Sequence, residues 1–173
     1  MTKEFVKNLL RDVIDFPKSG VHFKDISPVL NYPPAYRYIV QDIVKELQED
    51  NLDIVCGLDA RGFLLGPMIS DKLDIGFGMI RKAGKLPPPY IVQEYELEYG
   101  TDKISASPEI IKPGMRVHLH DDLLGTGGTM EAAIKLVEKL GATVVSISFI
   151  IELSDLNGKN KLKNYKYYSF LTL

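Results

Sequence analysis

Residues 117–133 read VHLHDDLLGTGGTMEAA. An apolar run leads into two adjacent acids, Asp121 and Asp122, which are followed by a loop rich in glycine and threonine and then by a helix-forming segment. This order predicts a strand, a loop and a helix of a parallel βαβ unit. In open α/β sheets ligands bind beyond the carboxyl ends of the strands, so the acids and the loop are expected at a binding edge.

The loop is suited to an anion, because glycines allow its backbone N–H groups to come close and the helix that follows adds unpaired N–H donors. It does not fit the usual nucleotide motifs, since no lysine follows the glycines and Met130 replaces the last glycine of G-x-G-x-x-G. Neighbouring carboxylates need donors or a cation, which sugar hydroxyls or Mg²⁺ would supply. The pattern therefore indicates a ribose phosphate. A glycine-rich turn with solvated acids is the alternative.

The rest of the sequence alternates between apolar runs and helical periodicity, which favours an α/β fold. Helices are expected over 3–14, 33–50, 61–73 and 129–141, and buried strands over 53–58, 76–81, 116–120 and 143–153. Residues from Lys82 to about Pro113 break the alternation, because they are rich in Pro, Glu, Lys and Tyr without a clean period. Connections of this length are usually functional lids or disordered.

Length and composition predict a single soluble domain over residues 1–173, with 45% hydrophobic and 25% charged residues. The net charge of −2 gives no general attraction to nucleic acid or anionic lipid. The only cysteine, Cys56, lies in an apolar run and cannot form an intrachain disulfide. We expect no membrane association and a cytoplasmic location, because no signal peptide is visible and the longest apolar run is shorter than the ~20 residues of a spanning helix.

The segment VHLHDDLLGTGGT resembles the phosphoribosyl-pyrophosphate signature of the type I phosphoribosyltransferases. Five other stretches resemble, in order, those of the adenine phosphoribosyltransferases: DFPKSGVHFKDISPVL, GLDARGFLLGP, IRKAGKLP, YELEYGTD and IELSDLNGKNKL. Together they cover most of the sequence from Phe16 to Leu162. The sequence departs from the family pattern at His118 and His120, where aliphatic residues are usual, at Gly125, where alanine is usual, and at Pro88, where glycine is usual.

The resemblance implies the type I phosphoribosyltransferase fold, in which helices flank a central, mostly parallel sheet. It also implies an N-terminal base-binding hood over about 1–33, a flexible lid loop over about 82–113, and a homodimer. The implied reaction is the Mg²⁺-dependent transfer of phosphoribosyl from phosphoribosyl pyrophosphate to adenine, which yields AMP and pyrophosphate in purine salvage. Two alternatives are an enzyme for hypoxanthine, guanine, xanthine or orotate and a regulator without turnover. The regulator would be expected to carry a basic face or a DNA-binding helix pair, and the sequence shows neither.

The same resemblance assigns roles to phosphate, ribose and pyrophosphate residues. The 5′-phosphate would lie on Gly125, Thr126, Gly127, Gly128 and Thr129, and the ribose hydroxyls on Asp121 and Asp122, with Mg²⁺ near both acids. Pyrophosphate would face Asp59, Ala60 and Arg61, together with Arg81, Lys82 and Lys85, whose crowded charges an anion would neutralise. A surface salt bridge is the alternative for Arg61 and a solvated turn the alternative for Lys85.

The remaining candidates concern the base and the proton. Phe23 offers a flat apolar face for stacking, and the backbone carbonyl and N–H groups of His22 and Lys24 would suit the amino group and ring nitrogen of adenine. A core phenylalanine is the alternative for Phe23. The resemblance implies three catalytic residues, Glu98, Arg61 and Lys82, of which Glu98 is the candidate for proton transfer. It also implies that Tyr99 is the aromatic residue of the lid.

Overall fold

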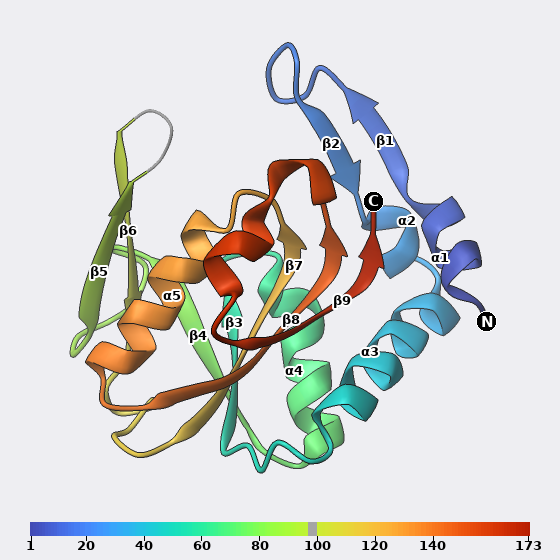
Figure 1. The fold of residues 1–173 in the computed structure, drawn as a ribbon. Helices are drawn as coiled ribbons and strands as arrows, with labels where there is room; N and C mark the ends of the chain where they lie inside the picture. Colours follow the sequence, from blue (N-terminus) through green and yellow to red (C-terminus); the bar gives the residue numbers. More distant parts are fainter. Residues whose placement is uncertain (97–99) are drawn as a thin grey trace.

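A central sheet of seven strands in the order β5-β6-β4-β3-β7-β8-β9 organises the part of the protein described by this computed structural model, residues 1–96 and 100–173 (Figure 1). Five strands are parallel: β4 (Gly76–Lys82), β3 (Ile54–Leu58), β7 (Arg116–Leu124), β8 (Thr143–Glu152) and β9 (Lys166–Thr172). The strands β5 (Ile91–Glu96) and β6 (Thr101–Ala106) complete one edge in antiparallel pairing. The predicted α/β class with a mostly parallel sheet is confirmed.

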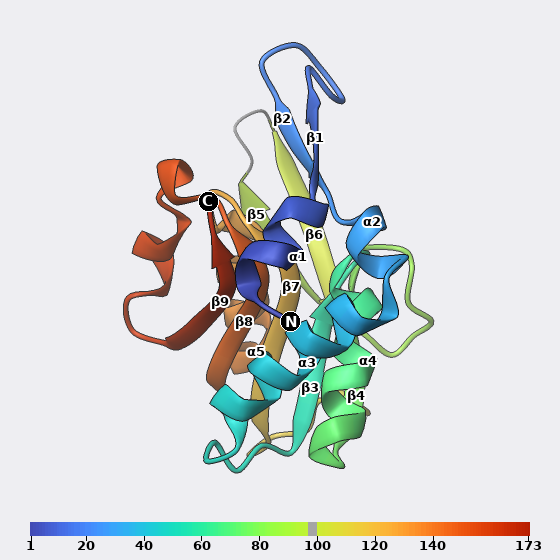
Figure 2. The same ribbon diagram turned by 90° about the vertical axis from the view of Figure 1, so that its right-hand side faces the viewer.

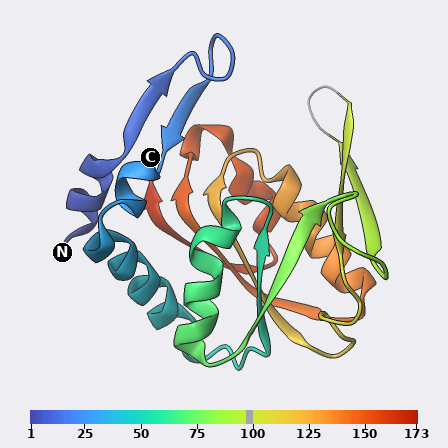
Figure 3. The same ribbon diagram turned by 180° about the vertical axis from the view of Figure 1, so that it is seen from behind.

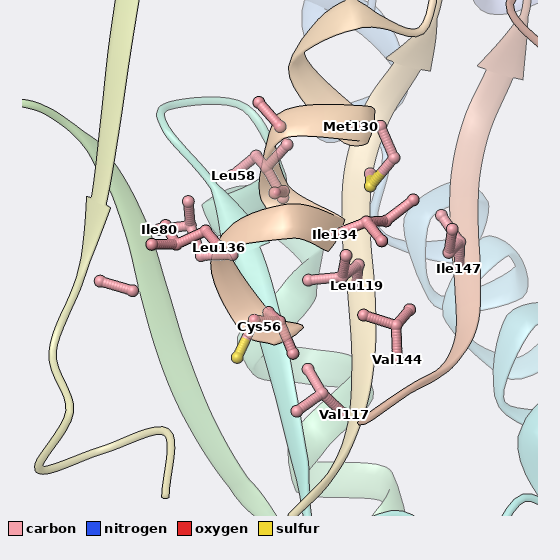
Figure 4. Close-up of a cluster of buried hydrophobic side chains, with 14 of the residues drawn as sticks. Cys56, Leu58, Ile80, Val117, Leu119, Met130, Ile134, Leu136, Val144 and Ile147 are labelled. Carbon is pink, nitrogen blue, oxygen red and sulfur yellow. The ribbon is translucent and has the colours of Figure 1, made fainter. Parts of the chain in front are cut away.

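Helices cover both faces of this sheet (Figures 1 and 2). On one face lie α3 (Pro33–Leu47) and α4 (Gly62–Leu73), and on the other lies α5 (Gly128–Lys139). The α5 side chains Met130, Ile134 and Leu136 belong to one buried cluster with Leu119 of β7 and Ile147 of β8, in which Leu136 lies beside Ile80 of β4 (Figure 4). None of the described helices has the length and apolar character needed to cross a lipid bilayer.

The N-terminal segment differs from its expected single helix over 3–14. Helix α1 (Lys3–Leu9) ends early, and the backbone then forms β1 (Arg11–Ile14), which pairs with β2 (His22–Asp25) before the short α2 (Ser27–Leu30). The cross-strand ion pair between Arg11 and Asp25, 2.6 Å long, stabilises the hairpin. Helical periodicity was misleading here because the partner strand, not the local spacing, determines the structure of residues 11–14.

The expectation of irregular structure between Lys82 and Pro113 is also wrong for part of the segment. Residues 91–96 and 101–106 form the β5–β6 hairpin, whose exposed positions carry charge pairs such as Glu94–Lys103. Strands whose exposed positions carry charge pairs lack a clean apolar alternation. Periodicity also failed to predict β9 and the two 3₁₀ helices before it, η1 (Ser154–Leu156) and η2 (Gly158–Leu162).

Both unusual histidines are fully buried within β7 and hydrogen-bond to serines of the neighbouring β8. His118 Nδ1 lies 2.9 Å from Ser146 Oγ and its Nε2 lies 2.7 Å from Ser148 Oγ, while His120 Nδ1 lies 2.9 Å from Ser148 Oγ. His120 Nε2 is buried without a partner among the described residues. Burial lowers the pKa of His120 to about 4 and that of His118 well below its usual value, so both rings are neutral.

We expect this burial to make the protein sensitive to acid. The unfolded protein takes up a proton on His120 near pH 6.5, whereas the folded protein resists it until about pH 4, so the contribution of His120 to stability is lost as the pH falls through this window. Between pH 7 and pH 5 the loss is about 2 kcal/mol. The free energy of unfolding in urea should depend less on pH in His120→Val than in the wild type. In the exposed control His22→Val the pH dependence should match that of the wild type. Equal pH dependence in His120→Val would contradict this account.

Candidate active site

The carboxyl ends of β3 and β7 lie next to each other and place two predicted segments opposite one another (Figure 3). The loop Asp59–Arg61 follows β3, and its Asp59–Ala60 peptide is cis. Asp121 and Asp122 lie within β7, close to its carboxyl end, because the strand extends to Leu124 and not only to the expected residue 120. A cavity of about 340 Å³ opens between them. Its lining includes Asp59, Ala60, Arg61, Lys82, Tyr95, Asp102, Asp121, Asp122 and Thr129.

Close packing of α4 on the sheet brings Arg61 to the acids. A Cβ on Gly62 would lie 2.5 Å from the carbonyl oxygen of His120, and a Cβ on Gly57 would lie 2.8 Å from the carbonyl oxygen of Gly62. Only glycines allow this approach. As a result Arg61 Nε lies 3.0 Å from Asp122 Oδ2, and the guanidinium sits 5.0 Å from the centre of the Phe23 ring.

Negative charge on the two acids is unfavourable in their buried surroundings. Burial, together with the charge of Asp122, raises the pKa of Asp121 well above its usual value, and burial raises the pKa of Asp122 despite the nearby Arg61. Asp122 Oδ2 and Arg61 Nη1 are buried without a hydrogen-bond partner among the described residues. Hydroxyl donors or a cation beside the acids would satisfy the carboxylates.

A divalent cation fits this donor set only if water and the substrate supply the rest of its ligands. Among residues 1–96 and 100–173, no three His, Cys, Asp or Glu side chains converge to form a metal cage. Mg²⁺ commonly binds through one or two carboxylates and takes its other ligands from water and substrate phosphates. Asp121 and Asp122 match that mode.

The glycine-threonine loop follows directly and opens the helix α5. Gly127 caps the helix at φ +78°, in the left-handed region that favours glycine, and α5 begins at Gly128. A second cavity of about 210 Å³ is lined by Asp121 and by all five loop residues, Gly125, Thr126, Gly127, Gly128 and Thr129. The first backbone N–H groups of α5 therefore face a space that adjoins the acids.

The predicted basic residues lie beside acids in the free protein. The Asp59 side chain is 5% exposed, and its Oδ2 lies 3.3 Å from Arg81 Nε, 3.4 Å from Lys85 Nζ and 3.4 Å from the Lys82 backbone nitrogen. Burial raises the pKa of Asp59, but the Lys82 N–H and the Lys85 charge outweigh it, so the net shift is downward. The Lys82 ammonium lies 3.3 Å from Asp102 of β6.

The N-terminal hairpin places a further cavity, about 440 Å³ in volume, next to Arg61. Phe23 lines it together with Phe16, whose ring lies 5.3 Å away in an edge-on arrangement. His22 and Lys24, which alternate with Phe23 along β2, line a different cavity together with Leu153. The Lys24 ammonium forms an ion pair with Asp12.

Comparison with known proteins agrees with this geometry. Residues 30–173 match the phosphoribosyl transferase domain family. Adenine phosphoribosyltransferase from Thermoanaerobacter pseudethanolicus is 44% identical over 99% of this chain and 100% of its own, with a TM-score of 0.96. The Rhodothermus marinus enzyme is 44% identical over 99% and 98% of the two proteins, with a TM-score of 0.95. The Giardia lamblia enzyme, solved with 9-deazaadenine, is 31% identical over 100% and 98%, with a TM-score of 0.95.

The chain belongs to the adenine phosphoribosyltransferases. Its fold is the type I phosphoribosyltransferase fold that the motif predicted. Three solved relatives therefore share the sheet, the helices and nearly the whole length of this adenine phosphoribosyltransferase.

Most of the predicted site residues of this adenine phosphoribosyltransferase converge. The loop after β3, the two acids and the glycine-threonine loop line two adjoining cavities. Arg81 and Lys85 do not line these cavities, but both form ion pairs with Asp59, which does. Glu98 and Tyr99 lie outside the described residues.

Sequence reasoning missed three residues that contact the site. Tyr95 and Asp102 of the β5–β6 hairpin line the larger cavity. Gly158 of η2 lies against the phosphate loop, because a Cβ on it would be only 2.1 Å from the carbonyl oxygen of Gly125. For Gly158 and Tyr95 the available signal was that each falls in a stretch that resembles the family. Asp102 ends such a stretch but carries no distinguishing pattern.

Proposed function

We propose that this adenine phosphoribosyltransferase is a Mg²⁺-dependent enzyme that transfers phosphoribosyl from phosphoribosyl pyrophosphate to adenine and releases AMP and pyrophosphate. The observation that carries the proposal is the buried acid pair beside an anion-binding loop at the carboxyl edge of the sheet. A solved relative supports it, since the Trypanosoma brucei adenine phosphoribosyltransferase forms a complex with AMP, pyrophosphate and ribose 5-phosphate. The proposal includes a role in purine salvage, a cytoplasmic location and a homodimer.

The charge of the larger cavity supports the role of Mg²⁺. Among the described lining residues, four aspartates (Asp59, Asp102, Asp121 and Asp122) face only two basic side chains (Arg61 and Lys82). Phosphoribosyl pyrophosphate is a polyanion, so a cation that entered with it would reduce its repulsion by these carboxylates. Asp121 and Asp122 would hold Mg²⁺ directly or through its waters. When bound, the metal would neutralise phosphate charge as the leaving group departs.

The proposed roles of the other residues follow from their positions. The N–H groups of residues 125–129 bind the 5′-phosphate, and the carboxylates of Asp121 and Asp122 accept hydrogen bonds from the ribose hydroxyls. As the bond between C1 and the pyrophosphate oxygen breaks, negative charge grows on the leaving group. Ala60 and Arg61, with Arg81, Lys82 and Lys85, stabilise that charge. Arg61 also fixes the orientation of Asp122 through their 3.0 Å contact.

Base recognition is proposed for the N-terminal hood, residues 1–33. Phe23 would stack on adenine, and the backbone of His22 and Lys24 would bind its amino group and ring nitrogen. The ion pair with Asp12 holds the Lys24 ammonium, which supports a role for the Lys24 backbone and not its side chain. Glu98 is proposed as the residue that exchanges a proton with the purine, and Tyr99 as an aromatic cover of the bound substrates within the 82–113 lid region.

Calorimetric titration with phosphoribosyl pyrophosphate tests the acid pair. With Mg²⁺ present, Asp122→Asn should bind ~10–150-fold more weakly, because a charged hydrogen bond worth ~1.5–3 kcal/mol is lost. Thermal unfolding should show that the fold survives, since removing a buried charge relieves repulsion from Asp121. The matched control is Asp74→Asn at the exposed left-handed end of α4, which asparagine tolerates. Unchanged affinity in Asp122→Asn would contradict the assignment.

A further inference from the structure

Asp102 holds the ammonium of Lys82 at the wall of the larger cavity. The Lys82 side chain is 54% exposed and that of Asp102 29% exposed, and their charged atoms, Nζ and Oδ2, lie 3.3 Å apart. Both residues line the cavity that also contains Ala60, Arg61 and the two acids of β7. Lys82 is the last residue of β4, whereas Asp102 belongs to the hairpin at the edge of the sheet. The contact therefore joins the end of β4 to the β5–β6 hairpin.

Asp102 is itself fixed by three donors. Its Oδ1 accepts a hydrogen bond of 2.8 Å from the Lys103 backbone N–H, and its Oδ2 accepts one of 3.3 Å from the Tyr95 hydroxyl in addition to the Lys82 contact. These donors, led by the Lys103 N–H, hold the pKa of Asp102 below its usual value. Asp102 is thus an ionised carboxylate in a fixed position at neutral pH. It is a partly exposed carboxylate that these donors hold in place.

We propose that Asp102 sets the affinity of the enzyme for pyrophosphate by competing with it for Lys82. This inference rests on the proposed function, which assigns Lys82 to the pyrophosphate. The ammonium carries a single positive charge, and sharing it between the carboxylate and a diphosphate oxygen weakens its interaction with each. Pyrophosphate therefore competes with Asp102 for Lys82, and the weakened ion pair reduces the net gain from binding. The negative Asp102 also opposes the anion directly across the cavity.

The competition has a consequence for turnover. When pyrophosphate leaves, the Lys82 ammonium regains its full ion pair with Asp102 instead of being left as an unpaired cation in the cavity that Arg61 also lines. The return of this pair favours release of the product. A site with basic residues alone would bind pyrophosphate more tightly in both directions of the reaction and would be more strongly inhibited by it.

Titration calorimetry with inorganic pyrophosphate and Mg²⁺ tests this proposal. In Asp102→Asn, pyrophosphate should bind ~2–5-fold more tightly than to wild type, because exposed ion pairs contribute up to about this much. Asparagine keeps an Oδ1 acceptor for the Lys103 N–H, so the hairpin should be preserved. Pyrophosphate should also become a stronger product inhibitor. A general structural defect would weaken binding, so a gain in affinity separates the two explanations.

The control is Glu94→Gln, which removes the ion pair between Glu94 and Lys103 on the same hairpin, where both side chains are about half exposed. It should leave the pyrophosphate affinity unchanged. Unchanged or weaker binding by Asp102→Asn would overturn the proposal, and weaker binding would indicate that Asp102 belongs to the metal or ligand side of the site.

A double-mutant cycle separates this inference from the proposed function. Lys82→Met alone should weaken pyrophosphate binding, and if it does not, the role assigned to Lys82 in the proposed function fails. If Lys82→Met does weaken binding, most of the gain from Asp102→Asn should disappear in the double variant. A full gain that persists without Lys82 would show that Asp102 does not act through this lysine, and the competition proposed here would be wrong.

Discussion

With phosphoribosyl pyrophosphate as the donor, we expect kcat/KM for adenine to exceed that for hypoxanthine or guanine by ~10⁴-fold or more. Adenine presents an amino donor beside an unprotonated ring nitrogen, whereas 6-oxopurines present an acceptor beside a protonated nitrogen. The backbone carbonyl and N–H proposed to bind the base beside Phe23 would satisfy only the first pattern. The wrong base would leave two buried polar groups facing like partners, and such unpaired groups are costly.

The side chain of Lys24 is the feature of the hood most able to change this result. Its ammonium could donate to a 6-oxo group if it turned toward the base, but it is held by Asp12 on the neighbouring strand. Initial rates with the three purines measure the preference, and Asp12→Asn tests the restraint, because the released lysine should raise activity with hypoxanthine relative to adenine. Comparable efficiencies of the wild-type enzyme with adenine and hypoxanthine would favour a 6-oxopurine enzyme instead.

Replacing Gly158 by alanine should lower kcat/KM by ~10²-fold or more, because misplacing bound groups by about 1 Å has effects of this size. The new Cβ would lie 2.1 Å from the Gly125 carbonyl oxygen and 3.0 Å from the Gly127 nitrogen. Both obstacles are backbone atoms of the phosphate loop, so the methyl group cannot be accommodated by a rotamer change. The loop must move away from η2.

Steady-state kinetics should show this effect mainly as weaker binding of phosphoribosyl pyrophosphate, with a cost in stability of ~1–3 kcal/mol from overpacking. Gly76→Ala is the matched control, since its Cβ would meet only a side-chain atom of Ile54 at 3.9 Å. Wild-type efficiency in Gly158→Ala would show that the contact with η2 does not position the loop.

The elements that were predictable from the sequence are those with strong local signals. Helix α3 was predictable from the apolar stripe Tyr36, Ile39, Val40, Ile43, Val44 and Leu47, of which Ile39, Val40, Ile43 and Leu47 are buried. The anion loop and the acids were recognised from residue types that follow one another directly, which is also how the family resemblance arose.

The features that were missed depend on partners distant in the sequence. Arg11 belongs to a strand because Asp25 pairs with it, and Lys103 because Glu94 lies opposite on β5. Gly158 reaches the loop only after η2 folds back onto it, more than 30 residues later in the sequence. The pairing of Asp102 with Lys82 likewise needs the antiparallel register between β4 and β6. Composition and periodicity contain none of this information.

The most direct test of the account is a crystal structure of this protein with Mg²⁺ and ribose 5-phosphate or phosphoribosyl pyrophosphate. We expect the 5′-phosphate within hydrogen-bond distance of the backbone N–H groups of residues 125–129, and the ribose hydroxyls on Asp121 and Asp122. The buried Asp122 Oδ2, which has no hydrogen-bond partner among the described residues of the free protein, should then accept a hydrogen bond or face the metal. A phosphate bound elsewhere, with the acid pair left without ligand contacts, would contradict the central claim.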